Sequence, residues 1–366
     1  MNEIASQAAR GRLEAPLPYA LTAPLLDAVR TNCHISDAQH GRNLTMCTYL
    51  LEMRELYRWE RGIALGATVP QAKVGPWMAQ REALWSSLEE AVHFPLPLDA
   101  LAIDPFDVER ANHMLVGQRL VYGAGIGRFG KPQFFLGALE SEEWRDGVRV
   151  LVAGHEYARD LSAAPAASRD GTIYVRLESL RRWLWERGEA WMGKRGDGAL
   201  KAALDSYGFT VAPDAAIERM AKVEAETLIL HELGECAAGR ILGPQWEDML
   251  GSLTRRRTEL FVRALRDHLA DCLVTLPALL ERDAAASLHF WFANLHGMRQ
   301  ALFPRLTTAY VRWREGDDGV ALRAAIDAGL PHWQNICAQV LDMHAAGADN
   351  TEDAIDTLSS ARVTAL

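Results

Sequence analysis

Cysteine is scarce in this chain of 366 residues, and its few cysteines show no pairing pattern. The five are scattered and odd in number, and no two of them form a CxxC motif. This usage argues against a disulfide framework and is typical of a reducing compartment. The first residues contain neither a basic cluster nor an apolar stretch, which predicts no secretory signal peptide. We therefore expect a cytoplasmic protein.

Long hydrophobic runs and an excess of positive charge are also missing. No run of about 18 apolar residues occurs, so we expect no membrane span and no membrane partner. The net charge of −9 argues against nucleic acid as a partner, because phosphate binding needs a basic surface. Hydrophobic residues make up 49% and charged residues 24%, which is the balance of an ordinary globular protein. The length predicts one large domain or two lobes.

Nucleotide-binding and nucleophile motifs are absent as well. The glycine-rich residues 123–130 precede no helical pattern and lack a Gly-Lys-Ser or Gly-Lys-Thr ending, which excludes a dinucleotide site or a P-loop there. A hairpin turn is the simplest prediction for them. No Gly-x-Ser-x-Gly elbow occurs, so the sequence holds no signal for that class of serine hydrolase.

The hydrophobic pattern divides the chain into four parts. Residues 1–118 carry apolar side chains at three- and four-residue spacing and predict an N-terminal helical region. Residues 119–176 contain short apolar runs joined by turns and predict a small antiparallel β-meander. Residues 177–346 predict a C-terminal helical domain, and residues 347–366 predict a flexible tail. The expected fold is mainly α with a small sheet (α+β), in which a helical bundle carries the functional site.

A His-Glu-x-x-Glu motif behind an apolar run is the most informative feature of the chain. His231 and Glu235 are four residues apart, so a helix places both on one face, where they can bind one metal ion. Glu232 points about 100° away, as a general base beside a metal site does. The usual motif ends in His, and the carboxylate that replaces it here is an acceptable ligand for zinc, iron or manganese.

A second polar cluster, Arg266 to Asp271, lies in a later predicted helix. His268 and Asp271 are three residues apart and share a face, and an apolar run follows them. In the alternative interpretation, Arg266 and Asp267 form salt bridges and His268 is a hydrogen-bonded core residue. If the two helices meet, they supply two histidines and two carboxylates, a set that suits Zn, Fe or Mn. The predicted metal ligands are therefore His231, Glu235, His268 and Asp271.

Two further clusters contain candidate substrate-binding residues. His34 and Asp37 belong to a dense polar segment next to a predicted helix start. His155 and Arg159 follow a predicted strand, where a loop can hold an anionic substrate. The alternatives are a helix cap for the first cluster and structural ion pairs for the second.

Several motifs carry a resemblance over nearly the whole chain. The segments are residues 32–37, 49–55, 127–132, 179–185, 231–235 and 266–271. In them the chain resembles an uncharacterised bacterial family of hypothetical proteins, and this resemblance implies no activity. A local similarity of about ten residues to zincin metallopeptidases rests on His231-Glu232-Leu233-Gly234 behind its apolar run. That similarity implies a zinc site, although Glu235 stands in place of the second histidine.

The sequence thus predicts a metal-dependent enzyme that acts on a small-molecule substrate. The expected chemistry is hydrolysis by metal-activated water, with Glu232 as general base. One alternative is an iron- or manganese-dependent oxidoreductase with a dinuclear site completed by Glu224, by Glu52 or Glu55, and by His34. The other is a non-catalytic binding or assembly protein whose polar clusters are buried networks. The sequence makes no prediction of oligomeric state.

Overall fold

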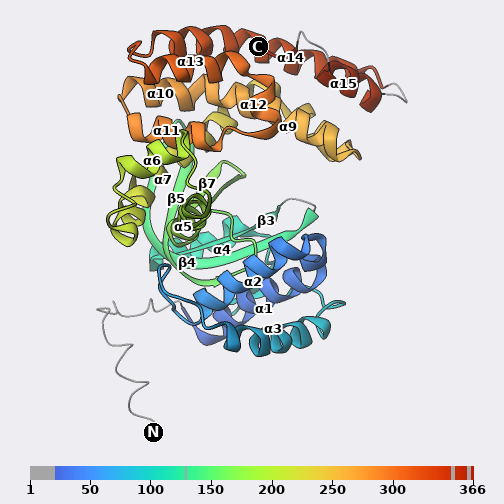
Figure 1. Cartoon of the computed structure of the whole chain (residues 1–366). Coiled ribbons are helices and arrows are strands. Elements are labelled where there is room, and N and C mark those ends of the chain that lie inside the picture. Colours follow the sequence, from blue (N-terminus) through green and yellow to red (C-terminus); the bar gives the residue numbers. More distant parts are fainter. Residues whose placement is uncertain (1–20, 128–129, 348–350, 361–363) are drawn as a thin grey trace. The chain divides into compact units, whose positions relative to one another are not determined.

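The computed structural model describes residues 21–127, 130–347, 351–360 and 364–366 (Figure 1). These residues are mainly helical and include a five-stranded mixed sheet and a two-stranded hairpin, which confirms the α+β class. They form two compact units. Unit 1 comprises the described residues up to Glu142 together with Leu151–Ala163, and unit 2 comprises Glu143–Val150 and the described residues from Ala164 onward. Among the helices described, none is both long and apolar enough to cross a membrane.

The described part of unit 1 has four α-helices, and strands follow the last of them. The helices are α1 (Ala23–His40), α2 (Met46–Glu60), α3 (Gln71–Ser86) and α4 (Val108–Leu115). The hydroxyls of Thr22 and Thr45 accept hydrogen bonds from backbone N–H groups one turn into α1 and α2, which explains where these helices begin. A short hairpin of β1 (Leu96–Leu98) and β2 (Leu101–Ile103) precedes α4. This hairpin escapes prediction because a proline stands in its first strand.

The larger sheet has the order β3-β4-β5-β7-β6. Its strands are β3 (Leu120–Ile126), β4 (Pro132–Arg145), β5 (Val148–Arg159), β6 (Ala166–Arg169) and β7 (Thr172–Arg176). The pairs β3–β4 and β6–β7 are antiparallel, but β7 lies between β5 and β6 and the sheet is mixed. The prediction of an antiparallel meander was therefore correct only in part. It missed β6, whose small side chains resemble those of a loop.

Apart from β6, β7 and the residues of β4 and β5 that belong to it, the described part of unit 2 is helical (Figure 1). The helices are α5 (Leu177–Lys194), α6 (Ala199–Ser206), α7 (Pro213–Leu242), α8 (Pro244–Ser252), α9 (Arg256–Ala270), α10 (Leu276–Glu281), α11 (Ala285–Asn294), α12 (Gly297–Leu302), α13 (Pro304–Arg314), α14 (Val320–Ala345) and α15 (Thr351–Ser360). A π-helical segment, Asp271–Thr275, joins α9 to α10. A proline opens α7, α8 and α13, where its fixed φ suits the first turn.

The expected flexible tail is wrong for residues 351–360, which form α15. Its carboxylate Glu352 accepts hydrogen bonds from the backbone N–H groups of Thr254 and Arg255, at the start of α9. Ile355 of α15 is fully buried against the core of unit 2. A polar, small-residue composition hid this helix, because its stability comes from docking on α9 and not from its own sequence.

Helices α7 and α9 approach each other most closely at a glycine. A Cβ on Gly234 of α7 would lie 2.6 Å from the carbonyl oxygen of Ala270, which immediately precedes the π-helical segment. That is closer than any side chain tolerates, so only glycine allows this backbone contact. Gly234 is accordingly buried in the helix interface.

Replacement of Gly234 should therefore destabilise unit 2. We expect Gly234→Ala to lower the free energy of unfolding by about 1–3 kcal/mol, because the obstructing atom is backbone and cannot rotate away. The matched control is Gly239→Ala on the same helix, where the added Cβ meets nothing within 4 Å. That change should raise stability by roughly 0.5–1 kcal/mol. Urea unfolding measures the free energy of unfolding of both variants. Equal changes in the two variants would contradict the close contact at Gly234.

Candidate metal centre

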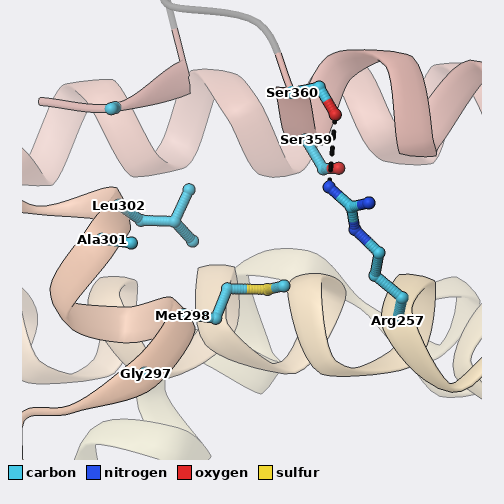
Figure 2. Close-up of a pocket in the computed structure, with 8 residues that line it drawn as sticks. Arg257, Gly297, Met298, Ala301, Leu302, Ser359 and Ser360 are labelled. Atoms are coloured by element: carbon cyan, nitrogen blue, oxygen red, sulfur yellow. Dashed lines mark hydrogen bonds between the residues drawn. The ribbon is translucent and has the colours of Figure 1, made fainter.

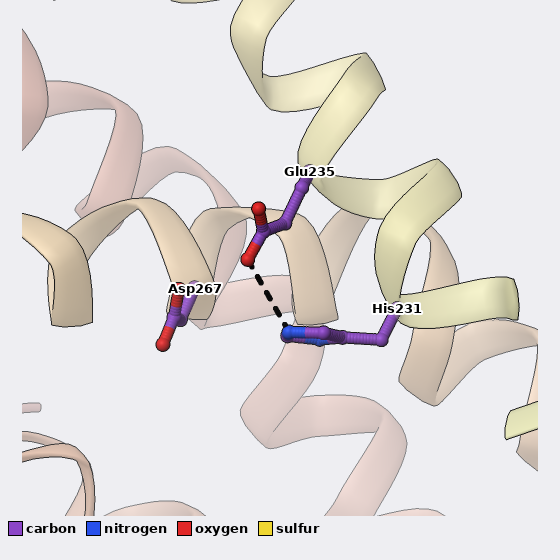
Figure 3. A group of neighbouring side chains, drawn as sticks. All are labelled: His231, Glu235 and Asp267. Carbon is purple, nitrogen blue, oxygen red and sulfur yellow. Dashed lines mark ion pairs between the residues drawn. The ribbon is translucent and has the colours of Figure 1, made fainter. Parts of the chain in front are cut away.

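His231 and Glu235 of α7 meet Asp267 of α9 in unit 2 (Figure 3). Each residue offers one ligand atom, and these atoms lie within 4.8 Å of one another. His231 Nε2 is 3.4 Å from a carboxylate oxygen of Glu235. Two ligands at about 2.1 Å from one metal are at most about 4.2 Å apart, so small side-chain rotations suffice to close this group around an ion. The three side chains keep about a fifth of their surface exposed, which leaves a path for an ion.

The other nitrogen of His231 faces a buried carboxylate. Its Nδ1 lies 3.0 Å from Oδ1 of Asp271, whose side chain is 1% exposed. The indole N–H of Trp291 donates to the same oxygen at 3.2 Å, and the guanidinium of Arg299 donates to the second oxygen. With Nδ1 donating to Asp271, the lone pair of Nε2 faces Glu235. Metal-binding histidines in proteins are commonly held in this way by a carboxylate.

Two arginines surround the three candidate ligands. Arg266 donates to the outer oxygen of Glu235 at 2.9 Å, and Arg299 Nε lies 3.7 Å from a carboxylate oxygen of Asp267. Four carboxylates belong to this cluster, so with all four ionised and His231 neutral it carries two net negative charges, because two arginines face them. The carboxylates are Glu232, Glu235, Asp267 and Asp271. One divalent cation balances that charge.

In the absence of a cation, protons take its place. Burial favours a neutral His231, yet Asp271 and Glu235 raise the pKa of the imidazole well above 6.5. Burial also disfavours a charged Glu235, but the hydrogen bond from His231 and the charge of Arg266 lower its pKa to about 2. Against the burial of Asp271, the charges of Arg299 and His231 hold the pKa of that carboxyl well below its usual range. The proton on His231 therefore occupies the position that a metal would take.

Glu232, the predicted base, lies beside this group. Burial and the negative charge of Glu235 raise the pKa of Glu232 to about 7. The hydroxyl of Ser168, in strand β6, hydrogen-bonds its carboxyl group. Strand β6 thus contributes to the surroundings of the cluster, a contact that no local sequence pattern indicates.

His268, predicted as a metal ligand, lies outside the group of described residues that can hold an ion. Among the described residues, the group that can hold an ion contains Asp267 in its place. His268 is fully buried, hydrogen-bonds the carbonyl oxygen of Arg299 through Nε2 at 2.9 Å, and stacks on Trp333 with ring centroids 4.6 Å apart. Burial, and then the charge of Arg299, lower the pKa of this ring to about 3. His268 is the hydrogen-bonded core residue of the alternative interpretation.

Glu224, a candidate for a second metal position, has other partners. Its carboxylate is fully buried and accepts hydrogen bonds from three hydroxyl groups, those of Tyr207 at 2.5 Å, Thr227 at 2.7 Å and Ser287 at 3.1 Å. It is not part of the ligand group in the described residues. Within unit 2 the geometry therefore favours one metal position over the dinuclear site.

The candidates His34 and Asp37 both lie inside α1, in unit 1, and cap no helix. Asp37 is buried and accepts a hydrogen bond from Lys131 at 2.6 Å. A carboxylate oxygen of Asp160 lies 3.7 Å from the same lysine nitrogen. The guanidinium of Arg81 forms a hydrogen bond with His34, and its Nη1 lies 2.7 Å from the imidazole Nε2. Burial, and then Arg81, lower the pKa of His34 to about 4. Asp37 has a structural role here, in the link between α1 and the sheet strands.

His155 and Arg159 lie within β5 and not in a loop after it. His155 is exposed and packs edge-on against Tyr157. Arg159 is 4% exposed, lies 4.9 Å over the ring of Trp59, and donates to the backbone carbonyl of Glu55. Arg159 is thus packed inside unit 1 and is not available to a substrate in this conformation.

The buried, neutral His34 predicts a pH-dependent stability of unit 1. Its pKa is depressed in the fold, so the unfolded chain takes up the proton first as the pH falls from 6.5 towards about 4. Stability should fall across that window with a slope of up to about 1.4 kcal/mol per pH unit from this residue. In His34→Gln this component of the slope should disappear, whereas the control His113→Gln, at an exposed site on α4, should keep it. Urea unfolding from pH 7 to pH 4 measures both, and a wild-type slope in His34→Gln would refute the assignment.

Two family models match the chain, one on each side of residues 177–180. Residues 24–176 match the N-terminal domain, and residues 181–362 the C-terminal domain, of a family of unknown function (DUF6866). The resemblance to an uncharacterised family is thereby confirmed. A search of the curated proteins and a search of the solved structures found no similar protein. Nothing in the comparisons supports the local similarity to zincins.

Proposed function

Since the chain belongs to DUF6866, a family of unknown function, we propose its activity from its own side chains. Unit 2 binds one divalent metal ion through His231, Glu235 and Asp267, and uses it to hydrolyse a small-molecule substrate. The observation that carries this proposal is that both ring nitrogens of His231 face carboxylates. Asp271 hydrogen-bonds one ring nitrogen, and the other nitrogen faces two carboxylates.

The charge balance of the cluster supports a cation over an anion. When all four are ionised, Glu232, Glu235, Asp267 and Asp271 outnumber Arg266 and Arg299 by two charges. Glu247, which also contacts Arg266, is 66% exposed, so water screens its charge. Both guanidinium groups already contact carboxylates of the cluster, so they serve as counter-ions. A buried ionic network of this kind is costly unless every member is satisfied, and a divalent cation satisfies this one.

The donor set, one imidazole and two carboxylates, suits Zn²⁺, Fe²⁺ or Mn²⁺. A divalent ion held by these residues would lower the pKa of a bound water to about 7 and so supply a nucleophile at neutral pH. Glu232 follows His231 on α7 and serves as the proton acceptor beside that water, while Ser168 holds its carboxyl group by a hydrogen bond. Asp271 and Arg299 touch neither substrate nor ion in this scheme and act as positioning residues.

Metal analysis of the full chain, purified without a polyhistidine tag, tests the site. We expect about one metal ion per wild-type chain, and loss of it in His231→Ala, Glu235→Gln and Asp267→Asn, because each change removes a ligand. Asp271→Asn should keep the site but weaken binding by about 10–100-fold, since it removes the hydrogen bond that orients His231. Binding should also release protons into a weakly buffered solution at pH 7, because the ion replaces the proton of His231.

The controls are changes outside the cluster. Glu259→Gln removes an exposed carboxylate from α9, where it pairs with Arg263, and His113→Ala removes an exposed histidine from α4. Both variants should keep the wild-type metal content. Metal that persists in Asp267→Asn and His231→Ala would place the ion elsewhere. No binding of Zn²⁺, Mn²⁺ or anaerobic Fe²⁺ would sink the proposal and favour the non-catalytic network.

Glu232→Gln separates metal binding from catalysis. Glutamine keeps the size of the side chain but cannot accept a proton, so metal content should stay at the wild-type level while hydrolysis falls by about 100-fold or more. A panel of chromogenic esters, amides and phosphoesters, run with the metal-loaded protein, supplies the readout. Loss of the metal in this variant would instead make Glu232 a ligand. Bound iron or manganese without hydrolysis would favour the oxidoreductase alternative.

A further inference from the structure

A second candidate binding site lies in unit 2, away from the residues of the metal centre. A cavity of about 440 Å³ is lined by residues from the start of α9, from α12 and from the end of α15 (Figure 2). This volume is within the range of small-molecule sites. None of the proposed metal ligands lines it, so this inference does not depend on the metal.

One end of the cavity is cationic and polar. Arg257 of α9 reaches towards Ser359 and Ser360 at the end of α15 (Figure 2), and its Nη2 donates to the Ser360 hydroxyl at 3.3 Å. In the part of the chain that the structure describes, Arg257 has no carboxylate within 4.0 Å. Arg255, two residues earlier, pairs with three carboxylates of α15. Arg257 is exposed to solvent, and no carboxylate of the described residues pairs with its positive charge.

The other end of the cavity is apolar. Ala301 and Leu302 of α12 lie at the side opposite Arg257, and Met298 lies between the two ends (Figure 2). Methionine and leucine side chains adapt to a flexible aliphatic chain without specific hydrogen bonds. A ligand that spans the cavity thus meets hydroxyls and a guanidinium at one end and aliphatic carbon at the other.

We propose that this cavity binds a small amphipathic anion, with its anionic head at Arg257 and its short aliphatic tail on Met298 and Leu302. The guanidinium offers two parallel N–H groups to a carboxylate or a phosphate, and the serine hydroxyls donate to the same oxygens. The tail covers the apolar end and excludes water from it. Head and tail are recognised by different elements, α9 and α15 on one side and α12 on the other.

The test is a calorimetric titration of the full chain with octanoate, octyl phosphate and 1-octanol. Octanoate or octyl phosphate should bind with a Kd of about 1 mM or below, and the tighter of the two identifies the head group. Octanol, which has the tail without the charge, should bind at least about tenfold more weakly. Arg257→Gln should weaken anion binding by about tenfold or more, because the charge-assisted hydrogen bonds are lost.

Two further variants make the result specific. Arg263→Gln removes another exposed arginine of α9, which pairs with Glu259 outside the cavity, and should leave anion binding unchanged. Ala301→Leu fills the apolar end and should weaken binding of the eight-carbon anions. Acetate has no aliphatic chain to place there, so its affinity should be the same for this variant and the wild type. The proposal is overturned if octanol binds as tightly as octanoate, if Arg257→Gln has the affinity of wild type, or if no anion saturates the site below about 10 mM.

Discussion

The close contact between α7 and α9 is the constraint on which the rest of unit 2 depends. At Gly234 the backbone of α7 lies against the Ala270 carbonyl, and no side chain fits between them. This contact sets the distance and rotation of the two helices, so that His231 and Glu235 face Asp267. The α-helical pattern of α9 changes to π-helical directly after Ala270. A local π-helix shifts the following side chains around the axis, and such segments are frequent at functional sites.

A second consequence is the position of Asp271 at the first residue of that π-helical segment. The carboxylate is buried, which costs free energy unless its charge is compensated. Compensation comes from three separate elements, through His231 of α7, Trp291 of α11 and Arg299 of α12. Removal of any one of these partners leaves the buried charge of Asp271 less well compensated. The ionic cluster therefore specifies how these helices pack, in addition to any chemistry it performs.

Much of the helical fold could be predicted from the sequence, because α2, α5 and α7 are amphipathic and start or stop at recognisable residues. The predicted C-terminal helical region starts at residue 177, which is the first residue of α5. Two short elements were missed because their local sequence only weakly favours the structure that they adopt. Strand β6 forms because its backbone pairs with β7, and α15 forms because it docks on α9. Both depend on contacts with residues that are distant in the sequence or in another element.

The candidate site was predictable where spacing alone determines geometry. His231 and Glu235 are four apart on one helix and do meet. On α9 the sequence places Asp267 and His268 side by side, and the group that can hold an ion contains Asp267, whereas Asp271 of the next segment hydrogen-bonds the other nitrogen of His231. His268 continues the apolar stripe of Phe261 and Leu265 and is buried with it, a pattern that the sequence alone displays. Arg299 and Trp291 had no such signal, since tertiary packing alone brings them to Asp271.

The short helix α12 gives unit 2 a property that neither of its two candidate sites has alone. Met298 lines the cavity, and the next residue, Arg299, holds Asp271 and faces Asp267. One helix thus supplies residues to both neighbourhoods, with four of its residues at the cavity and Arg299 at the carboxylate cluster. If occupation of the cavity moves α12, the affinity of the carboxylate cluster for a cation changes. Thermodynamic reciprocity then requires the cation to change the affinity of the cavity by the same factor. The cation and the ligand of the cavity would then be allosteric effectors of each other, coupled through α12.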